Sequence, residues 1–170
     1  MSKLLEFYRG EGEDVEGRTL ADLWALSDDE MEFHHDFIQW MFPLEEPSLF
    51  NFRAPVLSEE DIQAFHDEPA LRDNLQRSFD RFLSFLGLTR EGVRVAPAAD
   101  FESKREIFRA PDHNWLRITR VLTSLRLLGL EEQSRAFHAG LTRLMEDGLA
   151  RITSETRQYW QDAVFPPTAE

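Results

Sequence analysis

The sequence has 170 residues, 42% of them hydrophobic, and carries 32 acidic side chains against 19 lysines and arginines. This apolar content excludes an intrinsically disordered chain, and the length suits one domain built around one core. The formal net charge of −13 opposes nonspecific binding to nucleic acid or anionic lipid, because both need clustered basic side chains. The absence of cysteine excludes disulfides, thiolate metal sites and cysteine nucleophiles.

The charge is divided unevenly along the chain. Residues 1–70 hold 18 acidic and four basic side chains, a net charge of −14, whereas residues 71–170 hold 14 acidic and 15 basic ones. A basic island lies in residues 90–126, with eight bases and five acids. The acidic first part favours docking of a basic protein partner, with an affinity that falls as the salt concentration rises.

The first eighteen residues contain an apolar patch followed by an acidic connector. Glu6 interrupts the patch before it reaches the length of a signal peptide, and no stretch approaches the ~20 apolar residues of a membrane-spanning helix. We therefore expect no integral membrane segment and a cytoplasmic location. Three glycines among acidic residues predict that residues 9–18 are a short flexible segment.

Residues 28–42 are expected to form the first long helix. Ser27 and Glu30 make a capping box, and apolar residues then recur at helical spacing until Pro43 ends the helix. Residues 43–57 contain three prolines and six apolar side chains without any period. This stretch is predicted to be a long apolar, proline-rich connector that lies against the core.

Capping residues and helical spacing predict the later helices. Ser58 precedes a run of acids and caps one helix, and Pro69 suits the first turn of the next, which Gly87 ends. Gly92 and Pro97 favour a loop. Further helices are expected over residues 101–108 and 113–128, capped by Asp100 and Asp112, over residues 131–147, and after Ser154.

Strand patterns are missing, since no runs of Val, Ile and Thr alternate with period two. The predicted fold class is therefore all-α. We expect residues 1–170 to form a single domain, a helical bundle of about seven helices that includes the apolar connector, with a disordered tail at residues 166–170.

Two predicted helices carry polar side chains that are candidates for a site. On the helix over residues 28–42, His35 and Gln39 lie one turn apart at the edge of a wide apolar arc that contains Trp40. On the helix over residues 113–128, Arg117 and Arg120 share one polar stripe. Such a stripe can bind a carboxylate, a phosphate or an acidic peptide through paired hydrogen bonds.

A structural role for the arginine stripe is the alternative. Arg117 and Arg120 could instead pair with Asp36, Glu45 or Glu46 of the same chain as an internal salt-bridge latch. For His35 and Gln39 the alternative is a structural hydrogen bond at the border of the core.

Metal and cofactor sites have no visible ligand set. His35-Asp36 would suit a metal-dependent phosphohydrolase only with a further histidine upstream, and no histidine precedes His34. The zinc pattern of two histidines separated by three residues, and a glycine-rich phosphate loop after a strand, are also absent. We expect no cofactor, no metal site and no assignable catalytic residue.

Two runs of residues together resemble a known family. The first is His35-Asp36-Phe37-Ile38-Gln39-Trp40-Met41-Phe42-Pro43-Leu44, and the second is His113-Asn114-Trp115-Leu116-Arg117-Ile118-Thr119-Arg120-Val121-Leu122. With further matches in order from Phe7-Tyr8 onwards, the resemblance spans residues 7–165 and is to the opioid growth factor receptor conserved region.

The resemblance implies a shared fold and a binding surface. Vertebrate members are described as receptors for an endogenous opioid pentapeptide, associated with the nuclear envelope and restraining cell proliferation, with long additional C-terminal segments. A chain that consists of the family domain alone is typical of short microbial members, and we expect this one to be bacterial.

The hypothesis that follows is a non-enzymatic binding module for a short peptide or small anionic ligand. Its site is predicted to contain His35, Gln39, Trp40, Asn114, Arg117 and Arg120. One alternative is an acidic scaffold that docks a basic protein. A second is an enzyme in which His35 acts as general base while Arg117 or Arg120 holds an anionic substrate.

Overall fold

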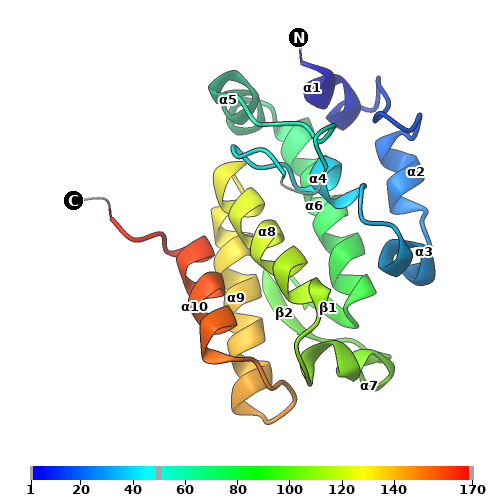
Figure 1. The fold of residues 1–170 in the computed structure, drawn as a ribbon. Coiled ribbons are helices and arrows are strands. Elements are labelled where there is room, and N and C mark those ends of the chain that lie inside the picture. Colours follow the sequence, from blue (N-terminus) through cyan, green and yellow to red (C-terminus); the bar gives the residue numbers. More distant parts are fainter. Residues whose placement is uncertain (1, 49–50, 169–170) are drawn as a thin grey trace. The chain divides into compact units, whose positions relative to one another are not determined.

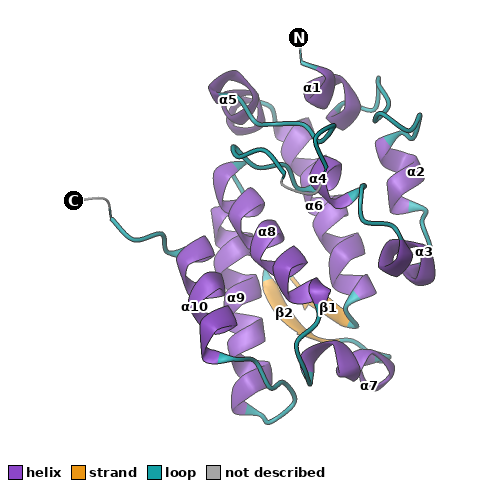
Figure 2. Ribbon diagram, viewed as in Figure 1, coloured by secondary structure: helices purple, strands orange, loops and turns teal. Residues whose placement is uncertain are grey.

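The computed structural model describes residues 2–48 and 51–168, and it is predominantly helical with one small two-stranded sheet (Figures 1 and 2). The all-α fold class is confirmed. The chain divides into two compact units, residues 1–81 and 82–170, and each is considered by itself. The expectation of a single domain, and of a disordered tail, stays a prediction.

The first unit is built from short helices and one long one. They are α1 (Lys3–Tyr8), α2 (Leu20–Trp24), α3 (Asp28–Phe33), α4 (Ile38–Met41), α5 (Glu59–Asp67) and the greater part of α6 (Pro69–Phe85), which runs across the boundary between the units.

A buried hydroxyl joins three of these helices. Ser78 of α6 is fully buried; its Oγ accepts a hydrogen bond from Trp24 Nε1 of α2 at 2.9 Å and donates its own proton to Tyr8 Oη of α1, also at 2.9 Å. The Tyr8 hydroxyl also donates to the carbonyl of Met41, and burial raises the pKa of Tyr8. These bonds satisfy polar groups that would otherwise destabilise the core by about 1–3 kcal/mol each.

The acidic connector before α2 is organised around one carboxylate. Asp14 is buried and accepts hydrogen bonds from the backbone N–H groups of Glu16 and Arg18, both at 2.9 Å. The Arg18 guanidinium adds an ion pair at 2.8 Å and also reaches Asp36 at 3.2 Å. The predicted flexibility of residues 9–18 stays a prediction.

The prediction of one long helix over residues 28–42 is wrong, because the backbone is not helical between Phe33 and Ile38. The Ser27 capping box is present, but α3 ends at Phe33, and His34 has an extended backbone with ψ 138°. Phe33, the last residue of α3, is exposed, whereas Phe37 and Trp40 are buried. Neither glycine nor proline lies in residues 34–37, so packing of the second half against the core overrides local helix propensity.

The connector over residues 43–57 contacts the core only in part. Leu57 is buried, and its backbone N–H donates to the Leu44 carbonyl at 2.8 Å, within an isolated parallel bridge between Leu44 and Val56. Phe52, however, is almost fully exposed, so the expectation that this connector lies against the core fails at that residue. Leu49 and Phe50 lie outside the described residues.

The second unit packs three long helices side by side. They are α8 (His113–Leu127), α9 (Glu131–Glu146) and α10 (Ser154–Val164), preceded by β1 (Leu88–Glu91), β2 (Arg94–Pro97), α7 (Phe101–Lys104) and the 3-10 turn η1 (Arg105–Phe108) (Figure 1). One face of α8 is apolar and buried, and it consists of Ile118, Val121, Leu122 and Leu125, with the buried Leu128 at the C-cap.

Polar side chains connect α8 to its two neighbours. The Trp160 indole N–H of α10 donates to the Trp115 carbonyl at 3.1 Å, and the Arg126 Nε donates to the Ala163 carbonyl at 2.7 Å. From α9, the buried Ser134 hydroxyl donates to the Leu122 carbonyl at 2.7 Å. These bonds fix the three helices relative to one another within the second unit.

The stretch after α6 is a β-hairpin, so the expectation of a loop without strands is wrong. Strands β1 and β2 pair antiparallel, with Thr89 opposite Ala96, and Gly92 has φ 60° at the turn (Figure 2). Each strand has four residues and only one buried side chain, Leu88 in β1 and Val95 in β2. Such short strands cannot show a recognisable alternation of apolar and polar residues in the sequence. The hairpin lies on α9, where Arg143 donates to the Val95 carbonyl at 2.7 Å.

Most predicted helix ends are confirmed. Ser58 and Asp112 accept hydrogen bonds from backbone N–H groups in the first turns of α5 and α8. Gly87 and Gly129 follow α6 and α8 with φ 77° and 90°, the left-handed conformation that glycine adopts without strain. Asp100 makes no capping hydrogen bond, and the helix predicted over residues 101–108 is α7 followed by η1.

Membrane-spanning length is not reached in the part of the chain that the structure describes. None of the helices there combines the length and the apolar composition that crossing a bilayer requires.

Candidate functional site

The six residues of the predicted site are divided between the two units. His35, Gln39 and Trp40 lie in the first unit, and Asn114, Arg117 and Arg120 lie in the second.

His35 and Gln39 are not one turn apart on a single helix. His35 is exposed and lies in the segment between α3 and α4, whereas Gln39 belongs to α4 and is buried. The helix break at His34 separates the two side chains into different elements. The alternative of a structural hydrogen bond between His35 and Gln39 stays a prediction.

Gln39 and Trp40 are both buried and both carry an unsatisfied polar atom. The Trp40 ring packs edge to face on Phe7, with centroids 5.1 Å apart. Within residues 2–48 and 51–168, neither Gln39 Oε1 nor Trp40 Nε1 has a hydrogen-bond partner. Buried polar groups are normally satisfied by protein, water or a ligand, so these two atoms are exceptions inside the first unit, and both are shielded from solvent.

Helix α8 carries Asn114 and Arg117 inward. Asp112 caps the helix, and Asn114, one residue into it, is fully buried. Arg117 is 6% exposed; its Nη1 donates to Asn114 Oδ1 at 3.2 Å, and its guanidinium lies 5.9 Å from the centre of the Phe85 ring. The amide thus orients the guanidinium along the helix.

Arg120 lies one turn further along α8 and is half-buried. Burial lowers the pKa of Arg120 from 12.5 to about 10, because desolvation disfavours the charged form. The guanidinium still carries its charge at neutral pH. The polar stripe predicted from the sequence is therefore largely buried. Ser124, which is fully buried, continues the stripe along α8.

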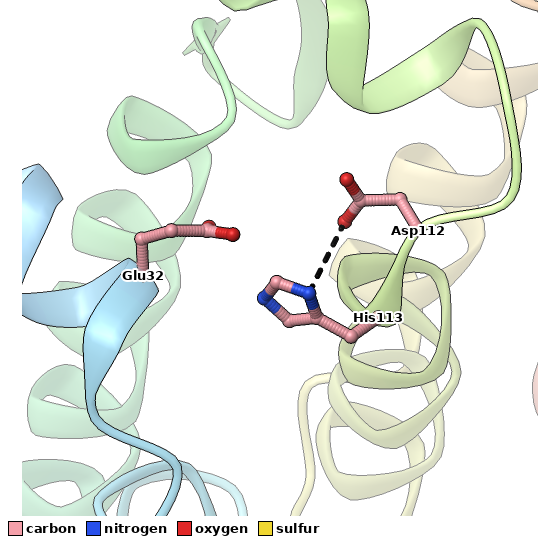
Figure 3. A group of neighbouring side chains, drawn as sticks. All are labelled: Glu32, Asp112 and His113. Atoms are coloured by element: carbon pink, nitrogen blue, oxygen red, sulfur yellow. Dashed lines mark ion pairs between the residues drawn. The ribbon is translucent and has the colours of Figure 1, made fainter.

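The N-terminus of α8 also presents an exposed polar pair. His113 Nδ1 lies 3.9 Å from the Asp112 carboxylate, and both side chains are partly exposed (Figure 3). A surface pair of this kind is worth about 0–1 kcal/mol. It helps to orient His113 at the start of α8.

Two hollows in the second unit are lined by residues outside the predicted six. One, of about 430 Å³, lies between α9 and α10 and is lined in part by His138 and Trp160. Burial lowers the pKa of His138. The other, of about 310 Å³, is lined by three arginines, Arg105, Arg109 and Arg151.

The sequence indicated these hollows only in part. The basic island over residues 90–126 contains Arg105 and Arg109, but Arg151 lies far along the chain. Pattern rules compare residues that are close in sequence, so a cluster formed by distant segments has no signal in them.

Comparison with known proteins gives a consistent result. Residues 3–165 match the family described as the opioid growth factor receptor (OGFr) conserved region. The opioid growth factor receptor of Homo sapiens is 34% identical over 155 residues, covering 86% of this chain and 22% of that protein. The receptor of Mus musculus is 37% identical over 111 residues, or 64% of this chain and 17% of that protein. Opioid growth factor receptor-like protein 1 of Mus musculus is 34% identical over 145 residues, or 81% and 30%.

No solved structure matches the chain. The chain spans less than a third of the length of these curated relatives. The family match nevertheless covers every helix and strand from α1 to α10. The chain belongs to the family of the opioid growth factor receptor conserved region.

Proposed function

We propose that this chain is a non-enzymatic, receptor-like binding module for a short peptide or a small anionic ligand. Curated relatives are named opioid growth factor receptors, and the matched region is the part that they share with this chain. The proposed ligand contacts are those of α8, Asn114, Arg117 and Arg120, with Gln39 and Trp40 of α4 as candidates to be tested separately.

The observation that carries the proposal is the pair of arginines withdrawn from solvent on α8. Arg117 is nearly buried and oriented by Asn114, and Arg120 follows one turn later with a lowered pKa. A guanidinium with reduced hydration attracts a carboxylate more strongly than one in bulk water does, because less water screens the charges. A free C-terminal carboxylate or an acidic side chain of a peptide suits this arrangement.

The α4 residues of the first unit offer contacts of a different kind, independent of those on α8. The unsatisfied Gln39 oxygen accepts a hydrogen bond and the Trp40 indole N–H donates one. A peptide backbone offers both complementary groups. Their role is tested by the variants Gln39→Leu and Trp40→Phe, which remove the polar atoms while keeping most of the apolar volume.

Isothermal titration calorimetry with an opioid pentapeptide, and with a short acidic peptide, tests the proposal. We expect saturable binding of one of them that weakens at least tenfold, about 1.4 kcal/mol, in the variant Arg120→Ala. The matched control is Arg135→Ala, an exposed arginine of α9 whose partner is Glu131 at 2.9 Å. Binding that is indifferent to Arg120→Ala would remove α8 from the site.

The acidic scaffold is the second candidate, and one observation favours it. Residues 1–81 hold 20 acidic and seven basic side chains, a net charge of −13, whereas residues 82–170 hold 12 of each. The whole net charge therefore belongs to the first unit, which suits a basic protein partner. The cytoplasmic location stays a prediction.

The enzyme alternative has no such support. A general base has to reach the proton of a bound substrate. His35 is exposed and lines neither of the two hollows described above.

A further inference from the structure

The smaller hollow of the second unit is lined by positive charge. Its lining consists of Arg105, Arg109 and Arg151 together with Gly148 and Leu149, around a volume of about 310 Å³. No carboxylate belongs to this described lining. The three arginines that line this space carry like charges, which repel each other unless an anion lies among them.

Buried neighbours hold the two backbone segments together. Arg109 follows Phe108, which is fully buried, and Arg151 lies between the buried residues Ala150 and Ile152. The Arg151 backbone N–H donates to the Phe108 carbonyl at 2.7 Å. The backbone that carries Arg109 and Arg151 is therefore held in place by burial and by this hydrogen bond.

Few internal interactions occupy the arginine side chains. In the described part of the chain, Arg151 makes no side-chain hydrogen bond or ion pair, and Arg105 Nε is buried without a hydrogen-bond partner. The other nitrogens of Arg105 lie 3.5 Å from Glu102 and 3.4 Å from the Gly148 carbonyl, both long contacts.

Arg109 has one good partner, but an exposed one. Its Nη1 lies 2.7 Å from the Glu106 carboxylate, and the Glu106 side chain is 80% exposed. Surface pairs of this kind are worth about 0–1 kcal/mol, so an incoming dianion can replace Glu106 at little cost.

We propose that this hollow is a binding site for a phosphate group, carried either by inorganic phosphate or by a small phosphomonoester. A phosphate has enough oxygens to accept hydrogen bonds from three guanidinium groups, whereas a single carboxylate has two oxygens. The volume lies at the lower end of the range of small-molecule sites, about 300–1,000 Å³, which limits the organic part of the ligand to a few atoms. This site is separate from the one proposed on α8.

Calorimetric titration of the full chain with inorganic phosphate and with glycerol 3-phosphate tests the proposal. We expect saturable binding of one phosphate group per chain, weakened at least tenfold by Arg151→Gln and by Arg109→Gln. Arg151→Gln leaves the backbone bond to Phe108 intact, so this variant is expected to fold, as its circular dichroism and melting temperature would verify. The control Arg135→Gln removes an exposed arginine of α9 outside the hollow and is expected to bind as tightly as the unchanged chain.

The two probes identify the source of the phosphate group. Tighter binding of glycerol 3-phosphate supports a phosphomonoester, and equal binding supports phosphate alone. Absence of saturable binding, or equal losses in Arg151→Gln and Arg135→Gln, would overturn the proposal. So would a loss of phosphate binding in Arg120→Gln with none in Arg151→Gln, because the phosphate would then lie at α8.

A gain of affinity provides an independent test. Glu106→Gln releases Arg109 from its ion pair and is expected to tighten phosphate binding several-fold. Glu132→Gln, an exposed acid of α9 away from the hollow, removes the same charge and is the control. Equal effects of the two substitutions would contradict the proposal, since only overall charge would then matter.

Discussion

Arg120 holds a positive charge where burial reduces its hydration. Its pKa is about 10 in the folded chain against 12.5 for a free side chain. The unfolded chain therefore binds the proton more tightly, and the charged side chain costs the folded state free energy at every pH below about 10. That cost disappears as the pH rises from the pKa of Arg120 in the folded chain, about 10, to its pKa in the unfolded chain, 12.5.

The variant Arg120→Met tests whether the charge of Arg120 destabilises the fold or stabilises it through an internal salt bridge. Methionine keeps much of the side-chain length and removes the charge, so we expect the melting temperature at neutral pH to stay unchanged or rise. Differential scanning calorimetry beside Arg135→Met, which replaces an exposed arginine, makes the measurement. A fall of several degrees in Arg120→Met alone would mean that a carboxylate of the same chain holds the guanidinium, as in the internal latch.

His138 is expected to make the free energy of unfolding depend on pH in the acidic range. Burial lowers the pKa of His138 from its ordinary 6.5, so the unfolded chain takes up a proton first as the pH falls. We expect the free energy of unfolding to decrease from neutral pH to about pH 5, and the variant His138→Gln to lose part of that decrease. Urea unfolding at both pH values, with exposed His66→Gln as the control, measures it. An identical pH dependence in both variants would contradict this account.

Elements in this chain were predictable where the signal is local. The Ser27 capping box, the Asp112 cap and the glycine after α6 are each read from a few neighbouring residues, and all are present. The break at His34 and the hairpin after Gly87 were missed, because both depend on packing against other parts of their own unit. The polar stripe of α8 was found, but its burial was not, since burial depends on the neighbouring helices.

Gly140 shows how closely two of these elements approach. It lies within α9, and a Cβ added there would come 2.9 Å from Val95 Cβ and 3.0 Å from the Val95 carbonyl oxygen of β2. Helix propensity alone predicts that Gly140→Ala stabilises the fold by about 1 kcal/mol. We expect the opposite, a loss of about 1–3 kcal/mol, because the methyl group displaces the hairpin from α9.

Chemical denaturation of Gly140→Ala and of Ala139→Gly makes the comparison. Ala139 is the exposed neighbour in the same helix, so its substitution reports propensity without a clash. Both variants are expected to lose stability. A gain in Gly140→Ala would mean that α9 and β2 separate without cost.

The whole molecule combines an acidic unit with a neutral one. Residues 1–81 carry the entire net charge of −13, and residues 82–170 carry none. Composition alone showed this division, since it needs no knowledge of contacts. The hollow of Arg105, Arg109 and Arg151 needed the structure, because the neutral sum of the second unit conceals a local excess of positive charge.

The salt dependence of binding distinguishes the acidic scaffold hypothesis from the ligand-binding hypothesis. If the acidic unit docks a basic partner, a fluorescently labelled oligolysine should bind at low salt, with an affinity that falls steeply as sodium chloride rises, because both charged surfaces become screened. Neutralising two exposed acids of the first unit, in Glu45→Gln with Glu46→Gln, should weaken binding measured by fluorescence anisotropy.

The matched control for that pair lies in the second unit. Glu132→Gln with Asp147→Asn removes the same number of exposed negative charges. If docking uses the first unit, the control should retain more affinity than the Glu45 and Glu46 variant, and Arg120→Ala should have no effect. Equal losses in both double variants would reduce the effect to total charge and remove the support for a docking surface. Oligolysine binding that persists at high salt would also contradict electrostatic docking, because the screening of exposed charges is unavoidable there.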